Sequence, residues 1–268
     1  TSRFILGNLS DFDYNNEKVN YEDMYEVDKW ALNKLERLKE KVKEYYEKYE
    51  FYNLFHEIQY FCGIEMSAFY LDIIKDRLYV EKTDSKLRRS AQTVMAEILE
   101  FLVRAISPVL SFTSEEIWEK MPEVLKDSES VHLSKWSEAR PEYINEELNA
   151  KWNKIMELRK EVYKEVEKAR QEKTVGLSLD AQVSISINNK EFEFIKDIAI
   201  NDLQDYFIVS KIHLGEEDNM VPAEIEGISI KVSKADGEKC ERCWKYDELG
   251  TDPAHSDVCP RCAEVLNS

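Results

Sequence analysis

Apolar side chains recur at helical spacing along most of the first 170 residues. Between residues 27 and 51 they advance by four and three positions in turn, at Ala31, Leu35, Leu38, Val42, Tyr45 and Tyr49. Residues three and four apart lie on one face of a helix, so this stripe predicts an amphipathic helix.

Two further long helices are predicted by the same rule. One is expected over about residues 52–81, with an inner face of Leu54, Ile58, Phe61, Phe69, Ile73 and Leu78. The next starts near Ser85 and buries Ala91, Val94, Ile98, Leu102 and Ile106. Pro108 ends it, because proline cannot continue a helix. Three long helices with short connections predict an antiparallel helix bundle.

Shorter elements are expected around these helices. Residues 3–9 are apolar enough for a short packed helix. Residues 113–116 (Thr-Ser-Glu-Glu) fit a capping box, which predicts a short helix that stops at Pro122. The polar stretch 123–144 is expected to be a loop, anchored by residues 131–133 and Trp136.

The pattern changes period after the bundle. A fourth long helix is predicted over about 145–173, with Trp152, Ile155, Val162, Val166 and Ala169 on one stripe. From residue 183, Val and Ile then alternate with Ser, which predicts a strand that ends near residue 188. Helical residues 191–205 and two strands, about 206–214 and 228–232, are expected to complete a small α+β unit.

These patterns predict a mainly α protein in three domains. Residues 1–144 form the helical bundle, residues 145–237 a connector helix with an α+β junction domain, and residues 238–268 a module that contains four cysteines. An apolar share of 43%, with only 7 Gly and 6 Pro, suits packed helices. The longest apolar stretch, residues 101–112, is interrupted by Arg104 and Pro108, so we expect no membrane span and a cytoplasmic protein. The first residue is Thr, and we expect a piece of a longer chain.

Charge restricts the partners that the protein can bind. The sequence has 37 basic and 54 acidic residues, a net charge of −17, which repels nucleic acid at long range and argues against a nonspecific DNA-binding or RNA-binding protein. Any RNA contact must therefore be local. Basic residues cluster at 86–89, 159–173 and 231–245. The second cluster alternates with glutamates and is typical of a solvated helix face.

Two C-x-x-C pairs carry the clearest chemistry in the chain. Cys240 and Cys243 are followed, after fifteen residues, by Cys259 and Cys262. Four thiolates on two short turns can enclose one structural Zn²⁺ and leave no position for a substrate. Two disulfides are the alternative, but cysteines at this spacing seldom bridge well, and no signal peptide indicates an oxidising compartment. Cys62 lies far away and is expected to be a small buried side chain, with a reactive thiol as the alternative.

Short motifs in the bundle carry a family resemblance. They lie at residues 3–9 (Arg-Phe-Ile-Leu-Gly-Asn-Leu), 76–79 (Asp-Arg-Leu-Tyr), 88–94, 112–118 and 130–133. They resemble the anticodon-binding region of class I aminoacyl-tRNA synthetases, specifically the bacterial isoleucyl-tRNA synthetases. Residues 169–173 with 176–179 resemble the junction domain of that family. Cys243-Trp244 and residues 259–262 are similar to its zinc finger, so the resemblance covers essentially the whole chain.

The resemblance implies a noncatalytic, tRNA-binding part of an isoleucine–tRNA ligase. Its partners would be tRNA(Ile) and the rest of the synthetase chain, with no DNA and no membrane, and we expect a monomer with one structural Zn²⁺. The family's His-Ile-Gly-His and Lys-Met-Ser-Lys-Ser signatures are absent from these residues. ATP is therefore expected to bind only in the catalytic domain of the full-length enzyme, and no catalytic residue is expected here.

The finger supplies three candidate tRNA-binding residues. Proteins read unstacked anticodon bases by stacking on aromatic or guanidinium planes and by hydrogen bonds to base edges. Trp244, directly after a metal-held cysteine, is a candidate stacking platform, and packing in the module's core is the alternative. Arg242 and Arg261 lie within the C-x-x-C turns and suit phosphate or base contacts. Alternatively, they offset the negative charge of the four thiolates.

The bundle supplies four more candidates: Arg3, Lys86, Arg88 and Arg89. The last three begin a helix, where exposed amides and positive side chains together attract phosphate. Asp76 and Arg77 are instead expected to form an ion pair within the bundle, and His255 to be a surface residue.

Two other functions fit parts of the sequence. The acidic charge suits a protein-interaction module made of a helix bundle and a zinc ribbon. The C-x-x-C spacing also resembles the finger of DNA-repair glycosylases, but the catalytic N-terminal proline of that enzyme is missing and long acidic helices do not suit it.

Overall fold

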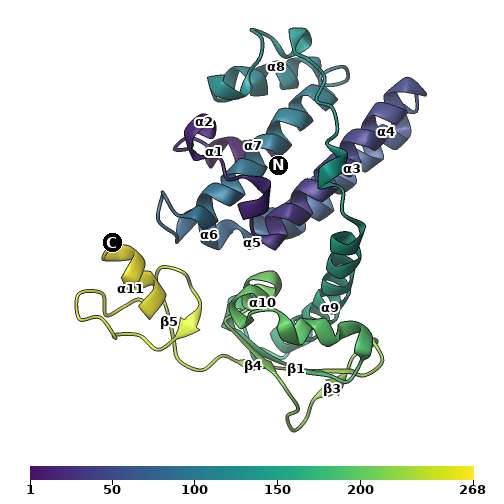
Figure 1. Cartoon of the computed structure of the whole chain (residues 1–268). Coiled ribbons are helices and arrows are strands. Elements are labelled where there is room, and N and C mark those ends of the chain that lie inside the picture. The colour runs from purple at the N-terminus through teal and green to yellow at the C-terminus, as the bar shows by residue number, and fades with distance from the viewer. The chain divides into compact units, whose positions relative to one another are not determined.

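The structure, a computed structural model that describes residues 1–268, confirms a mainly helical fold with a small sheet and a cluster of four cysteines near the C-terminus (Figure 1). The chain divides into two compact units, Thr1–Asn149 and Ala150–Ser268. We call them the bundle unit and the C-terminal unit and describe each by itself. The three-domain division at residues 144 and 237 stays a prediction.

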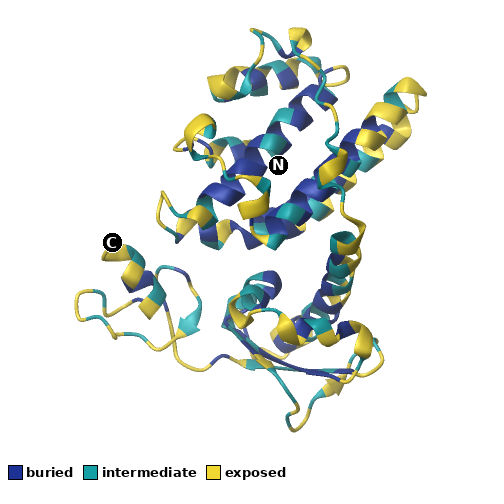
Figure 2. Ribbon diagram, viewed as in Figure 1, coloured by how far each residue is buried: buried dark blue, intermediate teal, exposed yellow.

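The bundle unit consists of helices joined by short turns. They are α1 (Ser2–Gly7), α2 (Tyr14–Glu17), η1 (Tyr21–Asp23), α3 (Glu26–Glu47), α4 (Phe51–Tyr60), η2 (Phe61–Tyr70), α5 (Leu71–Ile73), α6 (Lys75–Tyr79), α7 (Lys86–Ile106), α8 (Ser111–Lys120), η3 (Glu123–Leu125), η4 (Val131–Leu133) and η5 (Pro141–Tyr143). The longest, α3 and α7, contact each other, and buried residues follow their facing sides (Figure 2).

Helix α3 confirms the first predicted stripe over most of its length. Ala31, Leu35 and Val42 are completely buried. The prediction is wrong at Tyr49, which lies beyond the helix with a φ of 59° and is 79% exposed. Tyr46 points inward in its place, and its hydroxyl donates a hydrogen bond to the Ala105 carbonyl at 2.7 Å.

The second predicted helix is a series of segments with different periods. Helix α4 is followed by η2, a π-helix, and then by the short helices α5 and α6. All six predicted inner-face residues, from Leu54 to Leu78, are buried. In a π-helix each backbone hydrogen bond joins residues five positions apart instead of four. The side of the helix that faces the core therefore turns relative to that of an α-helix. The buried set was therefore predictable, but the change of helix type was not.

Helix α8 begins earlier than predicted. Its first residue is Ser111 and its N-cap is Leu110, so residues 113–116 lie within the helix and are not a capping box. Glu115 instead accepts hydrogen bonds from the Ser130 hydroxyl at 2.8 Å and the Val131 amide at 3.2 Å. These hydrogen bonds hold the following loop against α8. The predicted capping box gave no indication of this role for Glu115.

Two predicted loop anchors are buried to different degrees. Val131 is buried, whereas Leu133 is 66% exposed and does not anchor the loop. Arg140 supplies a stronger attachment, because its guanidinium donates to the buried carboxylate of Glu36 at 2.6 Å and also contacts Glu97. These ion pairs raise the pKa of Arg140 against the opposing effect of burial.

A buried carboxylate links α3, η2, α6 and α7. Asp28 is completely buried, and its oxygens accept from the Tyr70 hydroxyl at 2.8 Å, from the Ser90 hydroxyl and from the Arg77 guanidinium at 3.2 Å. Burial and the neighbouring carboxylate raise the pKa of Tyr70 well above its ordinary value. Arg77 thus pairs across the bundle with Asp28, a partner that its own motif did not indicate.

The C-terminal unit contains α9 (Glu146–Gln171), which is shared at its start with the bundle unit, and a four-stranded sheet. The predicted stripe of α9, from Trp152 to Ala169, is buried. The sheet order is β2-β1-β4-β3, formed by β1 (Ala181–Ile187), β2 (Lys211–Leu214), β3 (Val221–Pro222) and β4 (Ile228–Lys234). Strand β1 is parallel to β2 and antiparallel to β4, with Val183 opposite both Ile212 and Val232.

The parallel β1–β2 pair requires a crossover connection. This crossover consists of η7 (Lys190–Asp197) and α10 (Ile200–Phe207), and the short helix η6 (Ser178–Asp180) lies just before β1. The predicted strand 206–214 therefore starts too early, because Tyr206 and Phe207 complete α10 and Ile208 caps it in the left-handed conformation. No helix of the chain has the length and apolar character needed to cross a membrane.

Replacing Asp28 by Asn should destabilise the bundle by about 3–5 kcal/mol, because it breaks the buried ion pair with Arg77 by removing the charge of one partner. Urea unfolding followed by circular dichroism measures the loss. The matched control is Lys48→Ala, which breaks an exposed pair with Glu44 and should leave the unfolding midpoint unchanged. Equal stability of Asp28→Asn and the unsubstituted protein would show that the carboxylate is not needed.

Candidate metal centre and nucleic-acid interface

The two predicted C-x-x-C pairs come together in one buried cluster. Cys240, Cys243, Cys259 and Cys262 are all buried, and their sulfur atoms lie within 4.8 Å of one another. Two local elements place them. The strands β5 (Glu238–Lys239) and β6 (Tyr246–Asp247) flank the first turn, and Cys259 caps the helix α11 (Pro260–Leu266) that carries Cys262.

The spacing of the sulfurs fits zinc. Zn–S bonds of about 2.3 Å in a tetrahedron place neighbouring sulfurs about 3.8 Å apart. The Cys243 and Cys259 sulfurs are 3.8 Å apart. The amide of Cys259 also donates to the Cys240 sulfur at 3.3 Å, as suits a thiolate ligand. The donor set is all sulfur and enclosed, so a bound ion would hold structure and activate no water.

The thiols influence one another's ionisation. A hydrogen bond from Cys262 is the largest cause that lowers the pKa of Cys243 to about 5, and the nearby Arg261 charge adds to it. The same pairing raises the pKa of Cys262, and burial raises that of Cys259. The Cys243 thiolate thus forms readily, while Cys259 and Cys262 hold their protons more tightly. Ionising all four requires a cation at their centre, and Zn²⁺ supplies that charge.

The finger module, residues 238–268, is attached to α10 and to the residue before β2 by specific polar contacts. The Lys245 ammonium donates to Asp205 of α10 at 2.6 Å, and the Tyr246 amide donates to the Ser210 hydroxyl at 2.7 Å. Gly237 precedes β5 with a φ of 102°, and a Cβ there would lie 2.5 Å from the Asp247 carbonyl oxygen. Only glycine allows this close approach, so the position of the hairpin depends on it.

Trp244 projects from the first cysteine turn. Its amide donates to the Cys240 carbonyl at 3.0 Å, and the residue has a φ of 65°. This left-handed conformation normally costs a residue other than glycine roughly 1–2 kcal/mol. The side chain is 56% exposed, so it does not fill the core of the module. The Lys239 ammonium lies 5.7 Å from the ring centroid. An exposed ring on a strained backbone is a feature typical of functional sites.

Arg242 and Arg261 lie close to the cysteine cluster. Both are half-buried, and the charge of Arg261 acts on the Cys243 thiol. This placement suits the charge-offsetting role that the sequence left open. Part of each arginine side chain remains at the surface. A nucleic-acid contact by Arg242 or Arg261 stays a prediction.

The four bundle candidates lie away from the cysteines in sequence and differ in exposure. Arg3 is exposed on α1. Lys86 is exposed and pairs with Asp23 at 3.0 Å. Arg88 pairs with Asp11 at 2.8 Å and donates to the Leu78 carbonyl.

Arg89 is the least accessible of these candidates. Its side chain is buried and pairs with Glu17 at 2.8 Å, and it also donates to the Asp11 carbonyl and to Gln92. The guanidiniums of Arg88 and Arg89 therefore connect the N-terminal segment to α7. Their predicted tRNA contacts remain untested.

Sequence reasoning missed two features of this region. Tyr246, with the Lys234 ammonium 5.8 Å from its ring centroid, adds a second ring to the hairpin that carries Trp244. Its place directly after Lys245, at the end of the basic cluster 231–245, was a usable signal. The left-handed backbone at Trp244 had no signal, since glycine usually marks such positions. His255 is half-buried and does not belong to the cysteine cluster.

Two family models match parts of the chain. A family model described as the anticodon-binding domain of tRNA ligase matches residues 28–185. A second, described as a zinc finger found in FPG and IleRS, matches residues 237–265. The first match runs from α3 through α9 to β1, and the second contains all four cysteines.

Curated isoleucine–tRNA ligases are similar over nearly the whole chain. Identity is 48% over 270 residues with the enzyme of Geobacter sulfurreducens, 46% over 273 residues with that of Caldanaerobacter subterraneus, and 45% over 273 residues with that of Kosmotoga olearia. Each alignment covers 99% of this chain and 29% of the relative, so the chain spans less than a third of those ligases. Because the first family model matches more than half of it, the chain belongs to the family of anticodon-binding domains of tRNA ligases.

Proposed function

We propose that this chain is the part of an isoleucine–tRNA ligase that binds the anticodon loop of tRNA(Ile). The relatives' names and the family match support the assignment. The observation that carries it in the structure is Trp244, an exposed ring on a strained backbone beside the enclosed thiolates. Stacking on such a ring binds an unpaired base without requiring one particular sequence.

The basic side chains near Trp244 give the anionic protein a local RNA-binding surface. Lys239 lies over the Trp244 ring, Arg242 precedes it by two residues, and Lys234 lies over the Tyr246 ring. Together they supply positive charge where a base would stack, so phosphates flanking that base meet cations despite the net charge of −17.

In the bundle, we propose Arg3 and Lys86 as the accessible contacts with the tRNA. Arg88 and Arg89 act there mainly by holding residues 11–17 against α7, since their guanidiniums already bind Asp11 and Glu17. We assign different parts of the tRNA to the predicted modules 1–144, 145–237 and 238–268. The bundle grips the stem, and the junction and finger modules hold the loop.

The chain contributes to catalysis by positioning the tRNA. Binding at the anticodon orients the acceptor end toward a catalytic domain, and the ATP-dependent attachment of isoleucine occurs there, outside these residues. We further propose one structural Zn²⁺ per chain, held by Cys240, Cys243, Cys259 and Cys262, and a monomer that acts in the cytoplasm. Reduced thiolates of this kind suit a reducing compartment.

Chelation of the metal should unfold the finger module and leave the bundle helical, because zinc binding and folding of such a module are coupled. Elemental analysis should give one Zn²⁺ per chain, and Cys259→Ser should lower that number. Cys62→Ser is the matched control and should retain the metal, because Cys62 lies outside the cluster. Collapse of most helical circular dichroism on chelation would contradict the separation.

Replacing Trp244 by Ala should weaken binding of tRNA(Ile) by roughly 1–3 kcal/mol, the usual contribution of one base stack. Trp244→Gly provides a sharper test. Glycine relieves the left-handed strain, so this variant should retain zinc and its melting temperature while losing the same affinity. Filter binding against tRNA(Ile) and a tRNA with a changed anticodon measures both effects. Unchanged affinity of either variant would remove Trp244 from the binding site.

A further inference from the structure

The sheet of the C-terminal unit has a polar face on which the proposed function places no contact. Side chains alternate along a strand, so Val183 and Ile185 lie on one side of β1, where both are completely buried, and Ser184 lies on the other. The strand register places polar residues of β2 and β4 beside those of β1 on this second side. They are Gln182, Ser184, Lys211, His213, Lys231 and Ser233. The strands themselves supply no carboxylate to this face.

A carboxylate from an acidic loop lies on this polar face. Residues 215–220 join β2 to β3 and include Glu216, Glu217 and Asp218. The Glu217 carboxylate accepts hydrogen bonds from the Ser184 hydroxyl at 2.7 Å and from the Lys231 ammonium at 3.1 Å. Ser184 is only 3% exposed, so its hydroxyl is a buried donor that needs an acceptor, and Glu217 supplies it.

The two partners of Glu217 also suit a phosphate. Carboxylates and phosphates both present negatively charged oxygens that accept hydrogen bonds from hydroxyl and ammonium groups. The hydrogen bond from Ser184, followed by that from Lys231, lowers the pKa of Glu217, and the charge of nearby His213 adds to the effect. The carboxylate therefore stays ionised at neutral pH, and the sheet binds an anion that belongs to its own chain.

The loop that carries Glu217 has few other attachments to the sheet. The Glu217 amide donates to the Met220 sulfur at 3.3 Å, a weak acceptor within the loop. The Asn188 amide group reaches Glu216 only at 3.4 Å. Three residues of the loop are exposed, namely Glu216, Asp218 and Asn219. Segments with few buried contacts open at low cost in free energy, so a competing anion can displace the carboxylate without disturbing the core.

The polar face lies on strands that also contact the finger. Ser210, directly before β2, accepts a hydrogen bond from the Tyr246 amide at 2.7 Å. The ammonium of Lys234, the last residue of β4, lies 5.8 Å from the Tyr246 ring centroid. Tyr246 follows Trp244 by two residues. An RNA whose base stacks on Trp244 therefore has neighbouring phosphates near β2 and β4.

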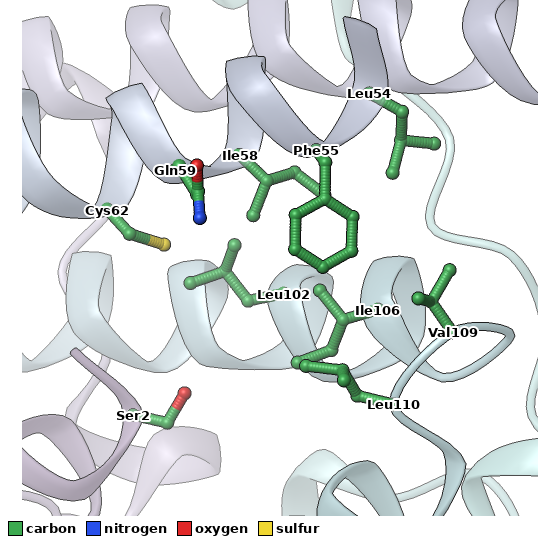
Figure 3. A pocket seen from close by; sticks show the side chains of 10 residues that line it. All are labelled: Ser2, Leu54, Phe55, Ile58, Gln59, Cys62, Leu102, Ile106, Val109 and Leu110. Carbon is green, nitrogen blue, oxygen red and sulfur yellow. The ribbon is translucent and has the colours of Figure 1, made fainter. Parts of the chain in front are cut away.

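The apolar pocket of the bundle unit offers no comparable site. It has a volume of about 210 Å³ between α4 and α7, where Phe55 and Ile58 face Leu102 and Ile106 (Figure 3). No charged side chain lines it. A phosphate there would meet no lysine or arginine to neutralise it, whereas the polar face of the sheet provides Lys231.

We propose that Ser184 and Lys231 form a binding site for an RNA phosphate, and that the Glu217 carboxylate fills this site until RNA displaces it. The inference rests on the proposed function, because the RNA is the one that stacks on Trp244. Glu217 acts as an internal competitor. A tRNA already held at Trp244 meets the site at a high effective concentration, whereas another polyanion does not. The loop thereby favours RNA that is bound at the finger.

The variant Glu217→Gln tests the proposal by filter binding of tRNA(Ile) to the zinc-loaded 268-residue chain. The amide keeps the shape of the side chain and removes its charge, so the affinity should rise several-fold. Glu193→Gln is the matched control, because it removes one negative charge from an exposed residue that pairs with Lys196 at 3.9 Å. An affinity of Glu217→Gln no higher than that of Glu193→Gln would overturn the proposal.

Lys231→Ala provides a second test that does not require Glu217→Gln to fold. It should weaken tRNA binding several-fold, and Lys196→Ala should not. With Lys231→Ala in place, Glu217→Gln should raise the affinity no more than Glu193→Gln does, because the two residues act on one site. Equal affinities of Lys231→Ala and Lys196→Ala, at unchanged melting temperature and zinc content, would contradict the site.

Lysine acetylation with mass spectrometry separates an RNA phosphate from a small free anion. In the Glu217→Gln chain, tRNA(Ile) should lower acetylation of Lys231 several-fold and leave that of Lys196 unchanged. Inorganic phosphate at the same concentration of phosphate groups should protect neither lysine, because nothing else holds it near the sheet. Protection of Lys231 by inorganic phosphate would assign the site to a small anion and overturn the proposal, as would a lack of protection by tRNA.

Trp244→Ala distinguishes a failure of this inference from a failure of the proposed function. If Trp244→Ala weakens binding and Glu217→Gln acts like Glu193→Gln, the phosphate site is overturned and the proposed function stands. If Trp244→Ala leaves the affinity unchanged while Glu217→Gln raises it several-fold, the phosphate site is supported. That second result would count against the stacking role of Trp244.

Discussion

A charge that is taken out of water must be compensated inside the protein, and this constraint shapes both units. In the bundle, the buried carboxylate of Asp28 is compensated by Arg77 and by two hydroxyl donors, and these contacts fix four helical segments relative to one another. In the finger, four sulfurs within 4.8 Å cannot all ionise without a cation. Arg89 belongs to the basic cluster 86–89, yet its side chain is buried. Its charge is therefore compensated by an ion pair with Glu17.

Features that depend on local spacing could be predicted from the sequence. The buried residues of α3, α7 and α9 follow from a period of three and four, and the cysteine cluster follows from two C-x-x-C pairs. Asp28 lies three residues before Ala31 and so occupies the same stripe, and a charged residue in an apolar stripe could have indicated a buried ion pair. Its partner, Arg77, could not be identified, since their pairing depends on how distant segments pack.

Other features depend on tertiary packing and had no local signal. The π-helix η2 shows the same apolar residues as an α-helix would, so composition does not reveal its longer hydrogen bonds. Helix α8 starts at Ser111 although residues 113–116 match a capping box, and Glu115, inside the helix, accepts hydrogen bonds from Ser130 and Val131. Trp244, directly after the first cysteine turn, adopts a left-handed conformation that its residue type disfavours.

The direction in which the Trp244 ring points depends on a strained turn, and that turn depends on a bound metal. The turn is held by Cys240 and Cys243, whose sulfurs need a cation to remain together as thiolates. A cell depleted of zinc would therefore make a polypeptide whose bundle folds normally while its indole has no fixed direction. Under the proposed function, loss of zinc would weaken the stacking of an anticodon base on this ring while the bundle stays folded.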